Sequence, residues 1–321
     1  MDPYNEYLQE LADVDTPLHP TGNKGAHRKR SRSEIVATLI EPSDGSEAGF
    51  NPSFHSSRHE REWIMTYLKV FYEDQQITDV LRQVKGGKEA TVYCCRAHVG
   101  LGGGLIAAKV YRPRMFRNLR NDSVYRAGRA TLDAEGKATH GTREGRALAN
   151  KTRFGQNLRH LSWLSNEFST LELLHKAGLD VPEPFADSAN AILMEYLGDE
   201  EQVAPTLNNV SIAAAEARPL FDRLIWNVAG MLDHNRVHGD LSAHNILYWE
   251  GELRIIDFPQ AVSPFENPNA FELFTRDVTR VCSYFARHGV DRDPSQLATD
   301  LWRTHQPTAP LPGDLLHEAE A

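Results

Sequence analysis

One stretch, residues 237–258, constrains the fold more than any other part of the chain. Its sequence is VHGDLSAHNILYWEGELRIIDF, in which two short apolar runs are separated by a turn containing Gly251. This pattern predicts a β-hairpin. Asp240 and Asn245 precede the first strand, and Asp257 ends the second. The hairpin therefore brings three polar side chains together at one end.

Such a set of side chains suits phosphoryl transfer. One carboxylate can orient an attacking hydroxyl or accept its proton, and a second carboxylate with an amide oxygen can hold Mg²⁺, which prefers hard oxygen ligands. Phosphoryl transfer depends mostly on positioning and on charge neutralisation. The spacing D-x-x-x-x-N, followed by an apolar strand and I-D-F, fits the catalytic loop and metal-binding segment of protein kinases. The structural alternative is a polar turn beside a buried hairpin.

Composition narrows the class of protein. The chain has 321 residues, of which 25% are charged and 40% hydrophobic, as in an ordinary soluble protein with one large or two small domains. A net charge of -9 argues against a uniformly basic nucleic-acid binder. The three cysteines form no disulfide framework or zinc spacing, so we expect a reducing cytoplasm. We find no signal peptide and no apolar stretch long enough to span a bilayer, and we expect no membrane partner.

The N-terminal part divides into two predicted segments. Residues 1–57 are polar and rich in Pro, Gly, Ser and charge, which predicts a disordered extension. Its basic cluster, residues 24–32, is either a contact for nucleic acid or a partner, or a solvated tail. Residues 58–82 carry apolar side chains at helical spacing, which predicts an amphipathic helix packed on the domain that follows.

Three strands are predicted within residues 84–110. Gly86 and Gly87, followed by Lys88, form the first connection, where glycine lets backbone N–H groups approach a phosphate closely. An ordinary hairpin tip would look the same. Lys109 lies in an otherwise apolar strand, so it needs an anionic partner if it points inward. An ATP phosphate together with a carboxylate would provide that partner.

Glu167 is a candidate for this carboxylate. It falls within an apolar stripe at helical spacing, and a carboxylate on a buried helix face should be paired. We therefore predict an ion pair between Glu167 and Lys109, with a Glu at the stripe edge reaching solvent as the alternative. The stripe consists of Leu164, Phe168, Leu171 and Leu174.

The segment between these two elements, residues 112–160, is strongly basic. Twelve Lys and Arg stand against four acidic residues, and its Gly, Ala, Asn and Thr content predicts partial disorder. Clustered positive charge attracts RNA phosphates without sequence preference. Few aromatic residues are interleaved, so base stacking is not supported. The segment is either a contact for RNA or a mobile, solvated insertion.

These motifs together resemble the RIO family of atypical serine/threonine protein kinases. The HGD-x-x-x-x-N piece is not specific, because aminoglycoside and choline kinases also carry it. GKEA-x-VY, DFPQAV and NP-x-A with RDV distinguish this sequence from those enzymes. The matching segments are GGKEATVY from Gly86, AAKVYR from Ala107, AGLDVPEP from Ala177, ILMEYLG from Ile192, VHGDLSAHNIL from Val237, and IDFPQAV with NPNAFELFTRDV from Ile256.

The resemblance implies an α+β, two-lobed protein-kinase-like fold, trimmed of peptide-docking segments, with ATP and Mg²⁺ between the lobes. It makes Asp240 the catalytic base, Asn245 and Asp257 the metal ligands, Lys109 the phosphate-binding lysine and Glu167 its partner. RIO kinases are thought to work largely as ATPases through a phosphoaspartate, which would form on Asp257. Family members act in small-subunit ribosome maturation, which would give the basic segment a purpose.

The same resemblance assigns boundaries and nucleotide contacts. The small lobe is expected at residues 83–198, the helical lobe at 199–304 and an acidic tail at 305–321. The small lobe contains the basic insertion. The expected nucleotide-binding residues are Gly86, Gly87, Lys88, Val92 and Lys109, with Glu195 and Leu197 at the adenine.

The sequence departs from the kinase and family patterns at several places. Its glycine connection lacks G-x-G-x-x-G, and Gly239 stands where typical protein kinases have the Arg that reads a phosphorylated activation loop. Regulation by activation-loop phosphorylation is therefore not expected. Ala243 and His244 replace an acidic and aromatic pair common in the family. The missing winged-helix pattern favours the subfamily without that domain, whereas DFPQ is more like the other one.

Three functions stay open at this point. The first is a RIO-type protein kinase or ATPase whose protein substrate includes the chain itself. The second is a small-molecule phosphotransferase, which would need an acceptor pocket after Asp257, although residues 258–269 are short and proline-rich for that purpose. The third is a slow nucleotide-dependent switch that binds RNA or the ribosome.

Overall fold

The computed structural model describes residues 49–87, 90–111, 153–188 and 190–306. These residues form two compact units, and each is described by itself. Described residues up to 111 and in the range 186–193 belong to the first unit, together with the start of one long helix. The second unit contains residues 163–185 and 194–306.

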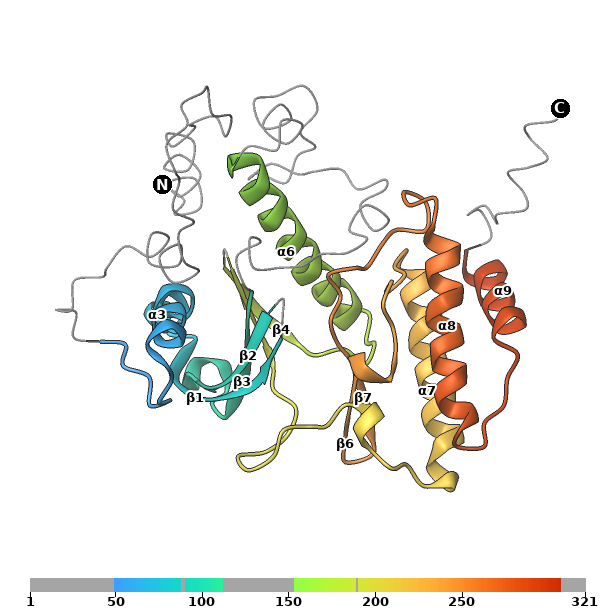
Figure 1. Cartoon of the computed structure of the whole chain (residues 1–321), viewed down its shortest axis with the longest axis horizontal. Helices are drawn as coiled ribbons and strands as arrows, with labels where there is room; N and C mark the ends of the chain where they lie inside the picture. Colours follow the sequence, from blue (N-terminus) through green and yellow to red (C-terminus); the bar gives the residue numbers. More distant parts are fainter. Residues whose placement is uncertain (1–48, 88–89, 112–152, 189, 307–321) are drawn as a thin grey trace, which may run out of the picture. The chain divides into compact units, whose positions relative to one another are not determined.

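A five-stranded sheet is the main element of the first unit (Figure 1). The strand order is β1-β2-β3-β5-β4, and the β1–β2 and β2–β3 pairs are antiparallel. The three strands expected around the glycine connection are present, whereas β4 was not predicted. The strands are β1 (Ile77–Gly86), β2 (Ala90–Ala97), β3 (Leu105–Tyr111), β4 (Pro184–Asp187) and β5 (Ala191–Glu195).

Helix α3 (Arg58–Glu73) precedes the sheet and buries one apolar face. Ser57 caps it, because its side chain accepts a hydrogen bond from the Glu60 N–H. The helix ends at Glu73, so the expected helix over residues 58–82 is wrong beyond that residue. Gln75 has a φ of 57°, which is not helical, and residues 77–82 belong to strand β1, where Ile77, Thr78 and Val80 are β-branched. The buried face of the helix is formed by Ile64, Leu68 and Phe71.

The segment just before α3 is packed rather than disordered. Phe50 is 6% exposed, and its ring centroid lies 4.9 Å from that of Tyr72 in α3. The Phe54 N–H donates to the Val80 carbonyl at 3.0 Å. The expected disordered extension over residues 1–57 is thus wrong for residues 49–57, where aromatic packing offsets the entropy of ordering the chain. Residues 1–48, with the basic cluster, lie outside the described residues.

The second unit combines helices with one hairpin (Figure 1). Helices α7, α8 and α9 lie side by side, and β6 pairs with β7 as the predicted antiparallel hairpin. Helix α9 was not predicted. Helix α6 begins inside the expected basic insertion, so residues 153–160 are helical, and residues 112–152 lie outside the described residues. The elements are α6 (Arg153–Lys176), α7 (Ala214–Asp233), β6 (Ile246–Trp249), β7 (Glu252–Ile255), α8 (Ala270–Ala286) and α9 (Pro294–His305).

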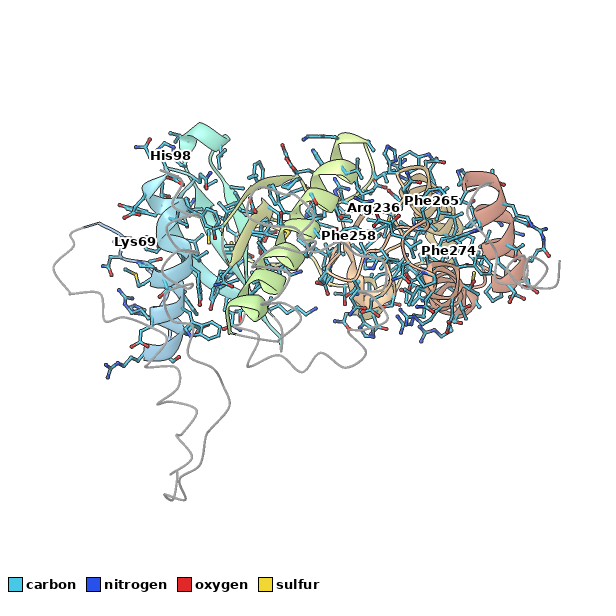
Figure 2. The ribbon with its side chains drawn as sticks, turned by 90° about the horizontal axis from the view of Figure 1, so that it is seen from above. Lys69, His98, Arg236, Phe258, Phe265 and Phe274 are labelled. Atoms are coloured by element: carbon cyan, nitrogen blue, oxygen red, sulfur yellow. The ribbon has the colours of Figure 1, made fainter. Side chains whose placement is uncertain are left out.

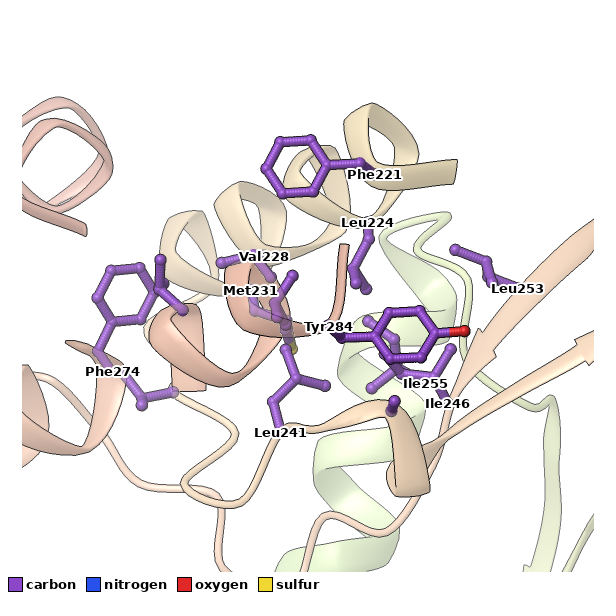
Figure 3. Close-up of a cluster of buried hydrophobic side chains, with 14 of the residues drawn as sticks. Phe221, Leu224, Val228, Met231, Leu241, Ile246, Leu253, Ile255, Phe274 and Tyr284 are labelled. Atoms are coloured by element: carbon purple, nitrogen blue, oxygen red, sulfur yellow. The ribbon is translucent and has the colours of Figure 1, made fainter. Parts of the chain in front are cut away.

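One continuous apolar core holds this unit together. Phe258 and Phe274 lie within its dense side-chain packing (Figure 2). Leu241 points from the loop after α7 into the same cluster, so the backbone around it is anchored by burial (Figure 3). Other members of this cluster labelled in Figure 3 are Phe221, Leu224, Val228 and Met231 of α7, Ile246, Leu253 and Ile255 of the hairpin, and Phe274 and Tyr284 of α8.

The C-terminal end of the described chain is anchored to α7. His305 Nδ1 lies 2.7 Å from Asp233 Oδ1. Gln306 is buried, and its Nε2 donates to the Leu232 carbonyl and to Asn235 Oδ1. The expected tail over residues 305–321 is therefore wrong at its start, and residues 307–321 lie outside the described residues. Within the described ranges, no helix has both the length and the hydropathy needed to cross a membrane.

Candidate active site

The backbone of Ile256 connects the end of the hairpin to the loop before it through two hydrogen bonds. Its N–H donates to the Asn245 carbonyl at 3.0 Å, and its own carbonyl lies 3.1 Å from His238 Nε2. Asn245 Nδ2 in turn donates to the Asp240 carbonyl at 2.9 Å and lies 3.4 Å from Asp240 Oδ2. Asp257 follows directly after Ile256. The structure thus places Asp240, Asn245 and Asp257 at one end of the hairpin, as the sequence predicts.

His238 is a structural member of this loop that sequence reasoning missed. It is 2% exposed, and its ring centroid lies 4.8 Å from that of Phe258. The Asp240 N–H donates to Nδ1 at 3.2 Å, so the proton of a neutral ring sits on Nε2 and is donated to the Ile256 carbonyl. Burial lowers the pKa of His238 below its usual value of 6.5. A neutral imidazole therefore joins the Asp240 segment to the Asp257 segment.

Gly239 has a structural reason to be glycine. Its φ is 79°, a backbone conformation that side chains disfavour. A Cβ at this position would stand 2.5 Å from the Gln260 carbonyl oxygen. The Gly239 N–H donates to Asp277 Oδ2 at 2.8 Å, and Arg276 Nη2 donates to the Gly239 carbonyl. The glycine thus permits both the turn itself and the close approach of the loop to the backbone of Gln260.

We expect Gly239→Ala to lower the free energy of unfolding by about 3 kcal/mol, since strained φ costs about 1–2 kcal/mol and steric overpacking a similar amount. Gly251→Ala is the matched control, because Gly251 has a φ of 90° and a Cβ added to it would meet no other atom within 4 Å. It should cost about 1 kcal/mol. Denaturant unfolding of both variants measures the difference. Equal losses would show that contact with Gln260 costs nothing.

Asp277 anchors the loop from α8. It is 2% exposed, and burial raises its pKa to about 7, although Arg276 and the N–H groups of Leu241 and Gly239 act in the opposite direction. Sequence reasoning missed it, yet a signal was present. A carboxylate in the middle of the apolar stripe of α8, directly before Val278, has to be paired.

Asn245 and Asp257 fit a magnesium site. The amide nitrogen of Asn245 is bonded to Asp240, so its side-chain oxygen is directed to the opposite side of the amide group. Asp257 has a φ of 76°, which is uncommon for a residue with a side chain and is typical of functional sites. In the described part of the chain, no group of three or more His, Cys, Asp or Glu side chains could hold a metal ion by itself. Two protein ligands completed by phosphate oxygens would match the usual way in which proteins hold Mg²⁺.

The glycine connection in the first unit is a tight turn. The Gly87 N–H donates to the Ala90 carbonyl at 2.8 Å, and a Cβ on Gly87 would stand 2.9 Å from the same oxygen. With the Gln83 carboxamide assigned so that both its polar atoms are bonded, the Gly86 N–H donates to Gln83 Oε1 at 3.1 Å, and Gln83 Nε2 donates to Glu60 of α3 at 2.7 Å. Helix α3 thus supports this turn. Lys88 lies outside the described residues.

Lys109 points inward, as expected of a lysine with an anionic partner. It is 8% exposed, and its Nζ lies 5.1 Å from the centroid of the Tyr111 ring. Val92 lies directly opposite it in the β2–β3 register, so these two predicted nucleotide contacts are neighbours. Glu167 is 1% exposed within its apolar helix face, also as predicted. Lys109 lies in the first unit and Glu167 in the second, so their ion pair stays a prediction.

Glu195 and Leu197 lie where β5 leaves the sheet. The Glu195 N–H donates to the Glu183 carbonyl at 2.8 Å, and the Leu197 carbonyl accepts from the Ala204 N–H at 3.0 Å. These bonds occupy one backbone group of each residue. The contact of these two residues with an adenine ring stays a prediction.

Comparison with known proteins supports the family seen in the motifs. The family model of the RIO domain matches residues 123–297, more than half of the chain. The RIO-type serine/threonine-protein kinase Rio1 of Haloferax volcanii is 33% identical over 223 residues, covering 67% of this chain and 66% of that protein. Rio1 of Thermoplasma acidophilum is 30% identical over 154 residues, covering 48% of this chain and 80% of that protein. Serine/threonine-protein kinase RIO1 of Homo sapiens is 29% identical and covers 72% of this chain.

The chain spans 66% of the length of the Haloferax protein and 38% of the human one. Among solved structures, the Rio2 kinase of Chaetomium thermophilum has a TM-score of 0.56 at 20% identity, covering 96% of this chain and 88% of that one. This likeness confirms the predicted α+β fold of the protein-kinase type. Since the RIO domain covers more than half of the chain, the protein belongs to the RIO family.

Proposed function

We propose that this protein is an ATP-dependent phosphotransferase of the RIO serine/threonine protein kinase type, with ATPase activity. The observation that carries the proposal is the pair of hydrogen bonds on Ile256, which set Asp257 beside the loop that holds Asp240 and Asn245. The relatives are serine/threonine-protein kinases by name, and the similar Rio2 structure is a complex with ADP, Mg²⁺ and a phosphoaspartate.

Each polar side chain of the hairpin end has a role in this proposal. Asp240 accepts the proton of the attacking hydroxyl, and Asn245 and Asp257 hold Mg²⁺. When bound, the ion neutralises charge on the ATP phosphates and orients them. Lys109, with Glu167 as its predicted partner, positions the phosphates. Gly86, Gly87, Lys88 and Val92 contribute to the nucleotide site, with Glu195 and Leu197 at the adenine.

Asp257 is also the proposed nucleophile of an ATPase cycle. One oxygen of its carboxylate attacks the γ-phosphorus, the bond to the β–γ bridging oxygen breaks, and ADP leaves with the electron pair. Water then attacks the phosphorus of the aspartyl phosphate, and Asp240 accepts a proton from that water. Inorganic phosphate and the Asp257 carboxylate are released, so the residue is restored for the next cycle.

The decisive experiment follows γ-labelled ATP with Mg²⁺. Free phosphate and label on the protein are measured in the wild-type chain, Asp240→Asn and Asp257→Asn. We expect hydroxylamine-sensitive label that is lost in Asp257→Asn, with phosphate released over time. Stable label on Ser or Thr would favour an ordinary protein kinase. ATP binding without turnover would instead favour a nucleotide-dependent switch, and transfer to small alcohols alone would favour a small-molecule phosphotransferase.

We also propose an acceptor and a location. The acceptor is a protein hydroxyl, including those of the chain itself, and the protein is cytoplasmic. The three cysteines form no disulfide and are buried, which fits a reducing compartment. The basic segment 112–160 supports a contact with RNA or a ribosomal particle. Filter binding of RNA at low and high salt tests this contact, and binding that does not change with salt would contradict it.

A further inference from the structure

Arg280 makes a direct contact with the proposed base. Its Nη1 lies 2.7 Å from Asp240 Oδ1, and the two side chains are each 40% exposed. The other carboxylate oxygen, Oδ2, faces Asn245 Nδ2 at 3.4 Å. Both oxygens of Asp240 therefore have a donor side chain, one from helix α8 and one from the start of the hairpin.

Arg280 belongs to a row of contacts that α8 makes with the loop. One helical turn before it, Arg276 donates to the Gly239 carbonyl and Asp277 accepts from the Gly239 N–H. Residues four apart lie on the same side of a helix, so Arg276 and Arg280 meet successive loop residues. The packed helix face thus defines where the guanidinium of Arg280 stands.

Stability alone does not account for this pair. Ion pairs between side chains that are this exposed contribute little to folding, because water and salt screen them. The loop itself supplies no cation, since residues 240–249 contain neither Lys nor Arg. Phosphoryl transfer depends on the placement of the base and on positive charge near the reacting groups. Asp240 is the proposed base, so its contact with Arg280 meets both of these requirements.

We propose that Arg280 is a positioning residue for Asp240, an inference that rests on the proposed function. The guanidinium and Asn245 hold the carboxylate in one orientation, so that its remaining lone pairs face the acceptor hydroxyl. During transfer, the hydroxyl oxygen forms the new bond to phosphorus, ADP leaves, and the hydroxyl proton passes to Asp240. Arg280 stays protonated throughout and moves no proton.

The test is a double-mutant cycle on ATP turnover. Arg280→Gln should lower kcat about ten- to a hundredfold with little change in KM for ATP, because a misplaced base costs rate rather than binding. Arg280→Lys should recover part of this loss, since it restores charge but not the planar fork. In the Asp240→Asn background, Arg280→Gln should change kcat by less than about twofold, because coupled residues are not additive. The matched control is Arg303→Gln, an exposed arginine on α9, which should match wild type.

The outcomes separate this inference from the proposed function. A wild-type enzyme that depends on Asp240 but tolerates Arg280→Gln would overturn the positioning role alone. So would equal losses from Arg280→Gln in the wild-type and Asp240→Asn backgrounds. Lack of any turnover in the wild-type chain would overturn the proposed function together with this role.

Discussion

Asp240→Asn is expected to lower ATP turnover by about two to four orders of magnitude, the usual effect of losing a positioned acid or base. The substitution keeps the size of the side chain and an oxygen that can accept from Arg280. It removes the charge and the basicity that a proton acceptor needs. ATP binding should be retained, because the proposed nucleotide contacts lie elsewhere in the chain. Turnover and ATP affinity are measured on the same preparations.

Asp233→Asn is the matched control for this experiment. Asp233 is also a carboxylate in an ion pair of the second unit, but its partner is His305 and its side chain is 53% exposed. Turnover of Asp233→Asn should equal that of wild type. Equal turnover in wild type and Asp240→Asn would remove Asp240 from the catalytic machinery. A loss of ATP binding in Asp240→Asn would show that the substitution disturbs more than proton transfer.

Asp277→Ala is expected to lower the free energy of unfolding by about 2–4 kcal/mol. The change leaves the Gly239 N–H without its acceptor and removes the carboxylate whose Oδ1 lies 3.8 Å from Arg276 Nη2, and removing one partner of a buried set is costly. Turnover should also fall, because Gly239 precedes Asp240 and loses its anchor on α8. Denaturant unfolding and ATP turnover measure the two effects separately.

The control for Asp277→Ala is Asp222→Ala on α7. Asp222 pairs with Arg218 one helical turn away, and both side chains are more than half exposed. Its replacement should cost less than about 0.5 kcal/mol. If Asp277→Ala unfolded at the same denaturant concentration as Asp222→Ala, the anchoring role of Asp277 would be refuted.

The pKa of Asp277 adds a pH dependence of known sign. Its folded-state pKa of about 7 lies above the usual 3.8, so the folded chain holds this proton more tightly than the unfolded chain. The stability that this group contributes is greatest below pH about 4 and is lost as the pH rises through about 7. Asp277→Asn cannot ionise. The free energy of unfolding of this variant should therefore rise relative to that of wild type between pH 5 and pH 8. A difference between the two proteins that stays the same over this pH range would contradict the raised pKa of Asp277.

Local patterns in the sequence were sufficient to predict the centre of the site. The hairpin depends on contacts between neighbouring residues, so its two strands and the gathering of Asp240, Asn245 and Asp257 follow from spacing. The burial of Glu167 followed in the same way from the helix face on which it lies, whereas the sequence left the direction of Lys109 open. The roles of these residues in catalysis remain predictions.

Other features depended on competition between local and distant contacts. Residues 74–82 continue an apolar pattern that fits a helix. The residues from Ile77 onward instead pair with β2 and form a strand of the sheet. Phe50 lies in a polar segment that predicts disorder, and its packing on Tyr72 orders it. Helix α9 was missed because its apolar residues are few, and Trp302 gains its burial from the rings of Phe271 and Phe274.

The sequence by itself determined the family, the hairpin and the identity of its polar side chains, because each follows from the spacing of residues that are close together in the chain. Only the tertiary structure decided what holds Asp240 in place. Arg280 and Asp277 stand well along the chain from the loop they contact, and no spacing in the sequence shows that their helix meets this loop. Burial of that face in the core fixes the rotation of α8, and the rotation brings its polar side chains to the loop.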